Sequence, residues 1–238
     1  MKKIKILLLI FFITFNSIAQ EPVYNGENFE IETVQVSHKE ELSLTVWTIK
    51  VKGNAGETTP VKAGQLDGAP VLGYVFPTNL DPTDVGFNKT EGIVALALTS
   101  HPDFDDTPLW DENSDKNYLN DGIIWHPHWV VLVTNNNVGG GLAVKQFKKG
   151  DTSVTLPPTN PGMPMYMDSP GFQVTTKANS ITVVIPDYRI NNKKDFNFDG
   201  VTAFLKVNTS NPDLPMLGVY NVYSVASGDL SLPYKVER

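Results

Sequence analysis

The sequence predicts an all-β fold, specifically a single-domain antiparallel β-sandwich of the jelly-roll or Ig-like kind, with roughly ten strands and almost no helix. Apolar and polar residues alternate with a period of two in several short segments, which is the pattern of half-buried strands. Segments rich in Gly, Pro, Asn and Asp separate them, at the spacing of turns in a sandwich or barrel. Only one helix start is recognisable, at Asp81 and Pro82.

Residues 1–19 predict an export signal that is removed from the mature chain. Three lysines precede an apolar segment, and the small residues Ser17 and Ala19 precede an expected cleavage site at Gln20. The apolar segment is too short to span a bilayer, and no later segment is long enough. We therefore expect an exported protein, periplasmic or extracellular, in which residues 20–238 form one domain without a membrane span.

The composition excludes several classes of partner and chemistry. The chain has no cysteine, so disulfides and thiol catalysis are both ruled out. Without the leader and its three lysines, 16 basic side chains stand against 26 acidic ones, a formal charge of −10. Such a surface repels phosphate backbones and anionic lipids, so we expect no nucleic-acid partner.

The expected strands follow one another along the whole chain. Residues 92–100 are apolar on both phases of the alternation, so they predict a central strand with both faces covered. Pro127 lacks an amide hydrogen and therefore predicts an edge or a bulge in its strand. The complete set of expected strands is 29–37, 42–52, 70–77, 92–100, 123–134, 142–147, 172–177, 180–188, 201–207, 217–226 and 232–236.

Three of the four histidines predict a transition-metal site. His126 and His128 are two residues apart, so they project to one face of the 123–134 strand. His101 ends the preceding apolar segment and could supply a third nitrogen if the two strands meet, which would satisfy zinc or copper. In local pattern these three residues resemble the zinc triad of α-type carbonic anhydrases and the paired histidines of cupins. The alternative is that His126 and His128 are half-buried strand residues hydrogen-bonded to the acids of the loop. His38 lies in an expected exposed connection, outside this site.

Three methionines provide a second candidate set of metal ligands. Met163, Met165 and Met167 alternate, so an extended segment would present their thioethers on one face. Thioethers are soft ligands suited to Cu(I), and a loop folded over the histidines would form a mixed copper site. The alternative is that methionine fills irregular space beneath a proline-rich loop, in which case zinc is the better interpretation of the histidines.

Two loops carry oxygen ligands at the spacing that begins a calcium loop. Neither matches an EF-hand completely, and both could be Asp/Asn turns that need no ion. We expect calcium at one of them, as a structural ion. The residues concerned are Asp111, Asn113 and Asp115 in the first loop, and Asp195, Asn197 and Asp199 in the second.

The acids that follow His101 are expected to support the histidines. Asp103, Asp105 and Asp106 could accept hydrogen bonds from imidazole ligands and orient them, or one could act as base beside a zinc-bound hydroxide. No G-x-S-x-G nucleophile motif is present, and no catalytic residue is assigned.

These observations together predict an exported metal-binding β-sandwich that acts as a binding or carrier protein, with copper or zinc held by histidines. Two other functions stay open. One is a calcium-stabilised module for a small-molecule or carbohydrate ligand, with tryptophans forming a sugar-stacking platform. The other is a zinc-dependent hydrolase or lyase, so that enzymatic activity is a lesser expectation than binding.

Overall fold

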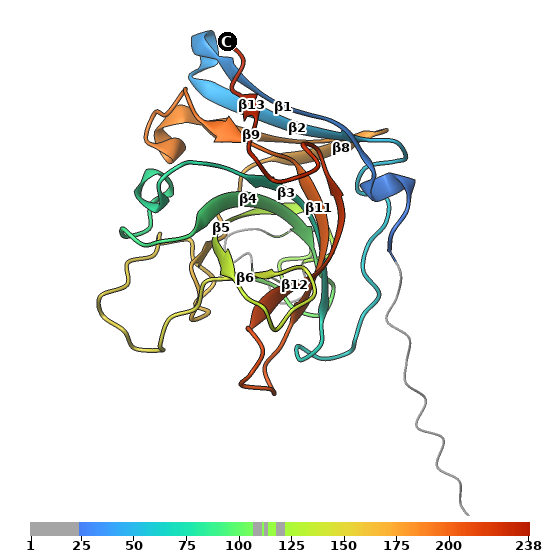
Figure 1. Cartoon of the computed structure of the whole chain (residues 1–238), viewed down its shortest axis with the longest axis vertical. Coiled ribbons are helices and arrows are strands. Elements are labelled where there is room, and N and C mark those ends of the chain that lie inside the picture. The colour runs from blue at the N-terminus through green and yellow to red at the C-terminus, as the bar shows by residue number, and fades with distance from the viewer. Residues whose placement is uncertain (1–23, 107–110, 112–113, 118–121) are drawn as a thin grey trace, which may run out of the picture.

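The computed structural model describes residues 24–106, 111, 114–117 and 122–238. In this part of the chain the protein is all-β, with thirteen strands, short 3-10 turns and no α-helix (Figure 1). Every ladder between the strands is antiparallel. The predicted leader and its cleavage site lie outside the described residues.

The strands are β1 Ile31–Lys39, β2 Leu44–Val51, β3 Pro70–Pro77, β4 Ile93–Ser100, β5 His126–Thr134, β6 Leu142–Val144, β7 Met167–Asp168, β8 Val174–Lys177, β9 Ser180–Pro186, β10 Asn197–Phe198, β11 Val201–Val207, β12 Leu217–Val225 and β13 Tyr234–Lys235. The 3-10 turns are η1 Glu27–Phe29, η2 Glu40–Leu42, η3 Pro82–Val85 and η4 Asp187–Ile190. The predicted helix start is confirmed as a single turn, because Asp81 is the N-cap of η3 and Pro82 is its first residue.

The main sheet closes into a barrel. Its strands run in the order β4-β3-β11-β12-β6-β5, β5 pairs back onto β4, and β7 adds a short pairing to β5. The closing ladder extends from Ile93 opposite Leu132 to Thr99 opposite His126. The sandwich prediction is therefore wrong in this respect, since the protein combines a six-stranded barrel with a separate four-stranded sheet. Closure removes the two sheet edges, and the alternation of apolar residues is the same in either architecture.

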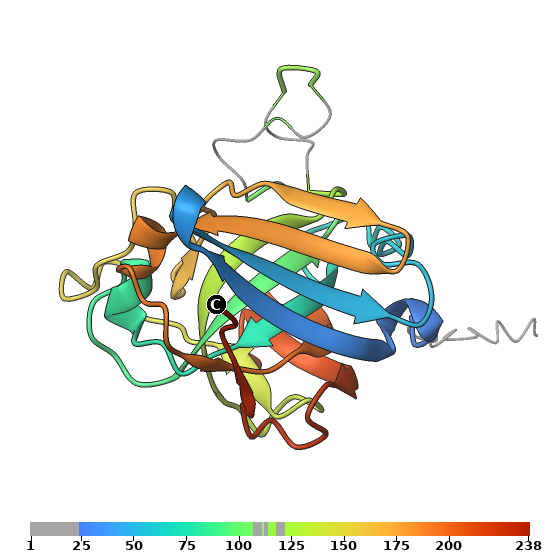
Figure 2. The same ribbon diagram turned by 90° about the horizontal axis from the view of Figure 1, so that it is seen from above.

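The four-stranded sheet, in the order β1-β2-β9-β8, covers one outer wall of the barrel (Figure 2). The core between them is aromatic. Trp47 of β2 packs edge-on against Phe76 of β3 and Trp129 of β5, with ring centroids 5.4 and 5.8 Å apart. Each such aromatic pair adds about 0.5–1.5 kcal/mol beyond the apolar area it buries. These contacts hold β3 and β5 of the barrel wall against the four-stranded sheet.

Strand β5 is buried on both faces. Trp129 and Val131 point into the aromatic core, while Val130 and Leu132 point into a second apolar core inside the barrel. By the two-residue period, the histidines at the start of β5 share the inward face. Pro127 predicts a strand edge, and the structure shows one on one side only. On one side Pro127 pairs with Leu98 of β4; on the other side the ladder with β7 covers only positions 129 and 130.

Among the described residues, no helix has the length and apolar character needed to cross a membrane.

Candidate metal centre

Three histidines and one aspartate meet inside the barrel. One ligand atom from each of His101, Asp106, His126 and His128 lies within 4.8 Å of the other three, and all four residues are buried. His126 and His128 begin β5, and His101 directly follows the last residue of β4. The antiparallel pairing of Thr99 with His126 places the end of β4 beside the start of β5. The structure therefore brings the three predicted histidines together in a group that could hold a metal ion.

The separations within this group match those of ligands around one ion. The Nε2 atoms of His101 and His126 are 2.8 Å apart. Oδ1 of Asp106 lies 3.1 Å from Nε2 of His101, 3.4 Å from Nε2 of His128 and 3.5 Å from Nε2 of His126. Nitrogen and oxygen ligands about 2.0–2.2 Å from zinc are themselves roughly 2.8–3.6 Å apart, with the shorter separations in octahedral and the longer ones in tetrahedral geometry.

The other ring nitrogen of each histidine is held by a hydrogen bond that sets its tautomer. Nδ1 of His101 lies 2.9 Å from the carbonyl oxygen of Phe104, and Nδ1 of His126 lies 2.7 Å from that of Ile124. A carbonyl oxygen only accepts, so each Nδ1 carries the hydrogen and donates it. The Nε2 atoms of both rings are then lone-pair acceptors.

Hydrogen bonds through Ser169 fix the tautomer of the third imidazole, His128. Ser169 donates its hydroxyl hydrogen to the carbonyl oxygen of Asp106 at 2.7 Å. Its oxygen, 3.0 Å from Nδ1 of His128, must therefore accept the hydrogen of that nitrogen. Nε2 of His128 becomes an acceptor as well, and it has no hydrogen-bond donor among the described residues.

Four buried acceptors consequently face one point. Three are imidazole lone pairs, and the fourth is the Asp106 carboxylate. Oδ1 of Asp106 and Nε2 of His128 have no hydrogen-bond donor in the described part of the chain, whereas Nε2 of His126 also lies 3.4 Å from the hydroxyl oxygen of Thr99. A buried acceptor without a donor costs about 1–3 kcal/mol, so polar atoms are seldom gathered in this way without a partner. A cation at the common point would satisfy all four at once.

The protonation states also suit a metal ion. Burial lowers the pKa of His128 from 6.5 to about 3, against the opposing effect of the Asp106 charge, so this imidazole is neutral at neutral pH. Burial by itself would raise the pKa of the Asp106 carboxyl, but the surrounding imidazoles outweigh it and hold that pKa well below its usual range. A neutral imidazole and an ionised carboxylate are the forms that bind metal.

Contacts within the turn after β4 and with Gly122 hold His101 in place. The ring of Phe104 stacks on that of His101, with centroids 4.2 Å apart and planes 4° from parallel. Gly122 accepts the backbone hydrogen bond of His101 at 2.6 Å. A Cβ on Gly122 would lie 2.6 Å from the carbonyl oxygen of His101 and 2.5 Å from that of Phe104, so only glycine allows this approach.

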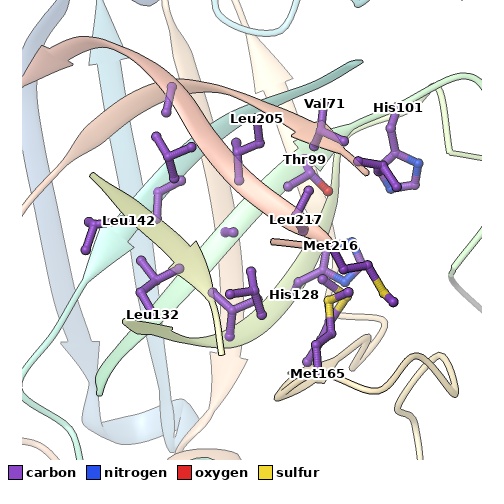
Figure 3. Close-up of a pocket in the computed structure, with 18 of the residues that line it drawn as sticks. Val71, Thr99, His101, His128, Leu132, Leu142, Met165, Leu205, Met216 and Leu217 are labelled. Carbon is purple, nitrogen blue, oxygen red and sulfur yellow. The ribbon is translucent and has the colours of Figure 1, made fainter. Parts of the chain in front are cut away.

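An apolar cavity of about 350 Å³ adjoins the cluster. His101, Asp106 and His128 line it near one end, and the rest of its wall consists mainly of aliphatic and methionine side chains from the barrel strands. Figure 3 shows His101 and His128 on one side of this space and Leu132 and Leu142 on the other. Three of the four candidate ligands therefore face an apolar space inside the barrel.

The predicted methionines line the same cavity. Met163, Met165 and Met167 all contribute to its wall, together with Met216 from just before β12. Figure 3 places Met165 and Met216 on the side of the cavity where His128 lies. The proline-rich loop thus folds over the histidine end of the barrel, and thioether coordination of copper stays a prediction.

The acids predicted to orient the histidines have different roles. Asp106 is in the cluster itself, as a candidate ligand. Asp103 accepts backbone hydrogen bonds from Ala63 and Gly64 at 2.9 and 2.7 Å, so it anchors a neighbouring loop. Asp105, half-buried, is not among the residues of the cluster.

The carboxylates of Asp111 and Asp199 in the two predicted calcium loops accept hydrogen bonds from the protein itself. Asp111 accepts hydrogen bonds from the backbone of Asp115 and Lys116, and Asn113 lies outside the described residues. In the second loop the buried carboxylate of Asp199 accepts from the backbone of Gly200 and Ser227. The Asn197 side chain donates to the carbonyl oxygen of Leu232, and Asp195 belongs to no cluster of three or more acids and histidines in the described chain. Calcium stays a prediction.

Two other expectations differ from the structure. His38 is on β1, buried, with Nε2 2.8 Å from Oδ2 of Asp187, so it is a structural residue of the four-stranded sheet and not part of an exposed connection. Trp47, Trp125 and Trp129 are buried in the core between the sheets. They form no exposed platform for a sugar.

Ser169 was not recognisable from the sequence. It lies in the proline-rich loop, 41 residues from the histidine that it orients, and only the fold of that loop brings the two together. Asp106 carried a partial signal as the last of several acids after His101. Comparisons with protein-family models, with curated proteins and with solved structures found no match for this chain, so the site is interpreted from its geometry alone.

Proposed function

We propose that the protein binds one transition-metal ion through His101, Asp106, His126 and His128, and that the ion is a resident part of a binding protein. The convergence of four buried acceptors on one point is the observation that carries this proposal. The three Nδ1 hydrogen bonds support it, since metal-binding imidazoles almost always donate their second nitrogen to such a partner.

Zinc is the ion that the donor set supports best. Three imidazole nitrogens and one carboxylate oxygen complete a tetrahedral zinc site. Copper is the alternative, supported by the methionines that line the cavity, because a Cu(I) ion displaced toward them would gain soft ligands. A carrier that releases its ion readily is a less suitable role, since all four ligands are buried.

A zinc-dependent hydrolase is the second candidate, because the apolar cavity reaches the ligands. Catalytic zinc usually keeps three protein ligands and a water molecule, with a separate base. In that case Asp106 would act as the base, and Asp106→Asn would keep zinc affinity while losing turnover of an apolar ester. In the binding function, the same variant loses zinc affinity.

We also infer export, with a mature chain that begins at Gln20. In residues 1–19, basic residues are followed by an apolar segment and then by small residues, which is the order found in export signals. The intact mass of the protein recovered outside the cytoplasm tests it, and retention of residues 1–19 would contradict it.

The direct test of the metal site is titration of demetallated protein with Zn(II), followed by calorimetry. We expect one ion per chain, and loss of most of the affinity in His126→Ala and in His128→Ala. His38→Gln is the matched control, because it removes a buried histidine outside the cluster; its zinc affinity should equal that of the wild type even if its stability falls. Equal affinities for wild type and the double variant His126→Ala/His128→Ala would refute the site.

A further inference from the structure

We propose that the barrel cavity binds a single-chain aliphatic carboxylate, and that the carboxylate group of this ligand coordinates the metal ion. This inference rests on the proposed metal function, because the ion supplies the positive charge that receives the head group. The lining, the shape and the charge of the cavity each support it.

The lining suits a hydrocarbon. Among the described residues of the cavity wall, Asp106 is the only one with a formal charge, and the only hydroxyl side chains are Thr99 and Thr209. The described residues of this wall include neither lysine nor arginine. A sugar would leave most of its hydroxyl groups without partners on such a wall, whereas an aliphatic chain would lose nothing by leaving water.

The shape suits one unbranched chain. The cavity extends along β4 from Thr99 at the histidine end to Ile93 at the other. Six residues of a strand at about 3.3 Å each, tilted by roughly 40° to the barrel axis, span about 15 Å. A volume of about 350 Å³ over this length corresponds to a cross-section of about 23 Å². At roughly 30 Å³ for each non-hydrogen atom, the space holds a chain of about twelve atoms.

The far end of the cavity offers an apolar entrance. Ile93, which lies opposite Leu132 at the end remote from the histidines, is 39% exposed and also lines the cavity. Val222 and Leu230 likewise combine a place in the lining with exposures of 39% and 38%. A chain could pass these side chains without desolvating a polar group of the wall.

The charge of the centre requires one anion. A divalent ion, the Asp106 carboxylate and three neutral imidazoles carry a net charge of about +1, in a site that is removed from water. A buried charge is costly unless it is paired, and in the described lining no second carboxylate is available to pair it. One carboxylate head group would neutralise the centre by becoming a fifth ligand, a coordination number that zinc accepts.

The test uses the full mature chain loaded with Co(II), whose visible absorption reports the number and type of its ligands. Decanoate should change this spectrum with saturation at one equivalent. Decanol has the same chain without the charge, and acetate has the head group without the chain. We expect neither to change the spectrum at the concentration at which decanoate saturates.

The length of the ligand's alkyl chain provides a second readout on the same wild-type protein. Affinity should rise about fourfold for each added CH₂ from hexanoate to decanoate, and should stop rising near twelve carbons, when the cavity is full. Ala203→Leu, which fills the cavity from β11, should weaken decanoate binding at least tenfold and leave Co(II) affinity unchanged. The chain-length series stands by itself if this variant does not fold.

The outcomes separate the two proposals. Failure of Co(II) or Zn(II) to bind would refute the proposed metal function. Normal metal binding with an unchanged spectrum at saturating decanoate would refute the ligand proposal alone. Equal affinity of the metal-loaded protein for decanol and decanoate would also refute it. So would equal affinity of the metal-free and the metal-loaded protein for decanoate, because in either case the head group would not contact the ion.

Discussion

Replacing Asp106 by Asn should stabilise the metal-free protein and weaken its binding of metal. The two side chains have nearly the same shape, but the amide can place N–H donors where the carboxylate offers only acceptors. In the metal-free protein the Asp106 carboxylate faces three imidazole acceptors, and Asp106 Oδ1 and His128 Nε2 have no hydrogen-bond donor among the described residues. The substitution therefore gives the metal-free state hydrogen bonds that it lacks, and removes a charged ligand from the metal-bound state.

The expected changes in the free energy of unfolding and in zinc affinity follow from the contacts of Asp106. One or two new buried hydrogen bonds, each contributing about 0.5–1.5 kcal/mol, should raise the free energy of unfolding of the metal-free variant by about 1–2 kcal/mol. For a chain of this size the melting temperature should rise by roughly 2–8 °C. A structural zinc site contributes about 10–16 kcal/mol, so one ligand of four accounts for roughly 2.5–4 kcal/mol, and zinc affinity should fall by about 10²–10³-fold.

The assay compares thermal unfolding at pH 8 with and without EDTA, together with zinc titration against a competing chelator. Asp103→Asn is the matched control, since its carboxylate lies three residues away and accepts hydrogen bonds from the backbone of Ala63 and Gly64. That control should lose stability with or without zinc and keep the zinc affinity. A lower melting temperature for metal-free Asp106→Asn, combined with unchanged zinc affinity, would show that Asp106 is a satisfied core residue and would refute the reasoning.

Three further predictions follow from the same site. Ser169→Ala removes the hydroxyl that orients His128 and should lower zinc affinity by about 10–100-fold in the same titration, whereas an unchanged affinity would make Ser169 a packing residue. Acid should destabilise the metal-free protein between about pH 6.5 and about 3, because the folded state excludes a proton from His128 that the unfolded state binds. Urea denaturation should show a slope of up to about 1.4 kcal/mol per pH unit from this group, and a flat profile in this range would contradict its burial as a neutral ring. Replacing Met163, Met165 and Met167 together by leucine should abolish Cu(I) binding with Zn(II) binding intact if the thioethers are ligands; retained Cu(I) affinity would assign them to packing.

Local sequence patterns were sufficient for the strands and for part of the site. The two-residue alternation predicts several of the main strands, and β2 and β9 occur close to where the alternation places them. The spacing of His126 and His128 by itself determines that they share a face, because side chains alternate along any strand. The apolar residues on both phases of 92–100 likewise indicated that β4 is covered on both sides, as it is.

Contacts between distant segments decided the rest. A sandwich and a barrel have the same alternation, and only the pairing of β4 with β5 across the sheet closes it and turns the histidines inward. The same closure creates the apolar cavity beside them.

The remaining members of the site come from irregular segments. Asp106 becomes a candidate ligand because the turn after β4 brings its carboxylate to 3.1 Å from Nε2 of His101, and Ser169 reaches His128 only through the path of the proline-rich loop. Neither turn has a period that a sequence pattern could reveal. Local periodicity therefore determined which residues could act, and tertiary packing determined that three imidazoles and one carboxylate meet at a single buried point.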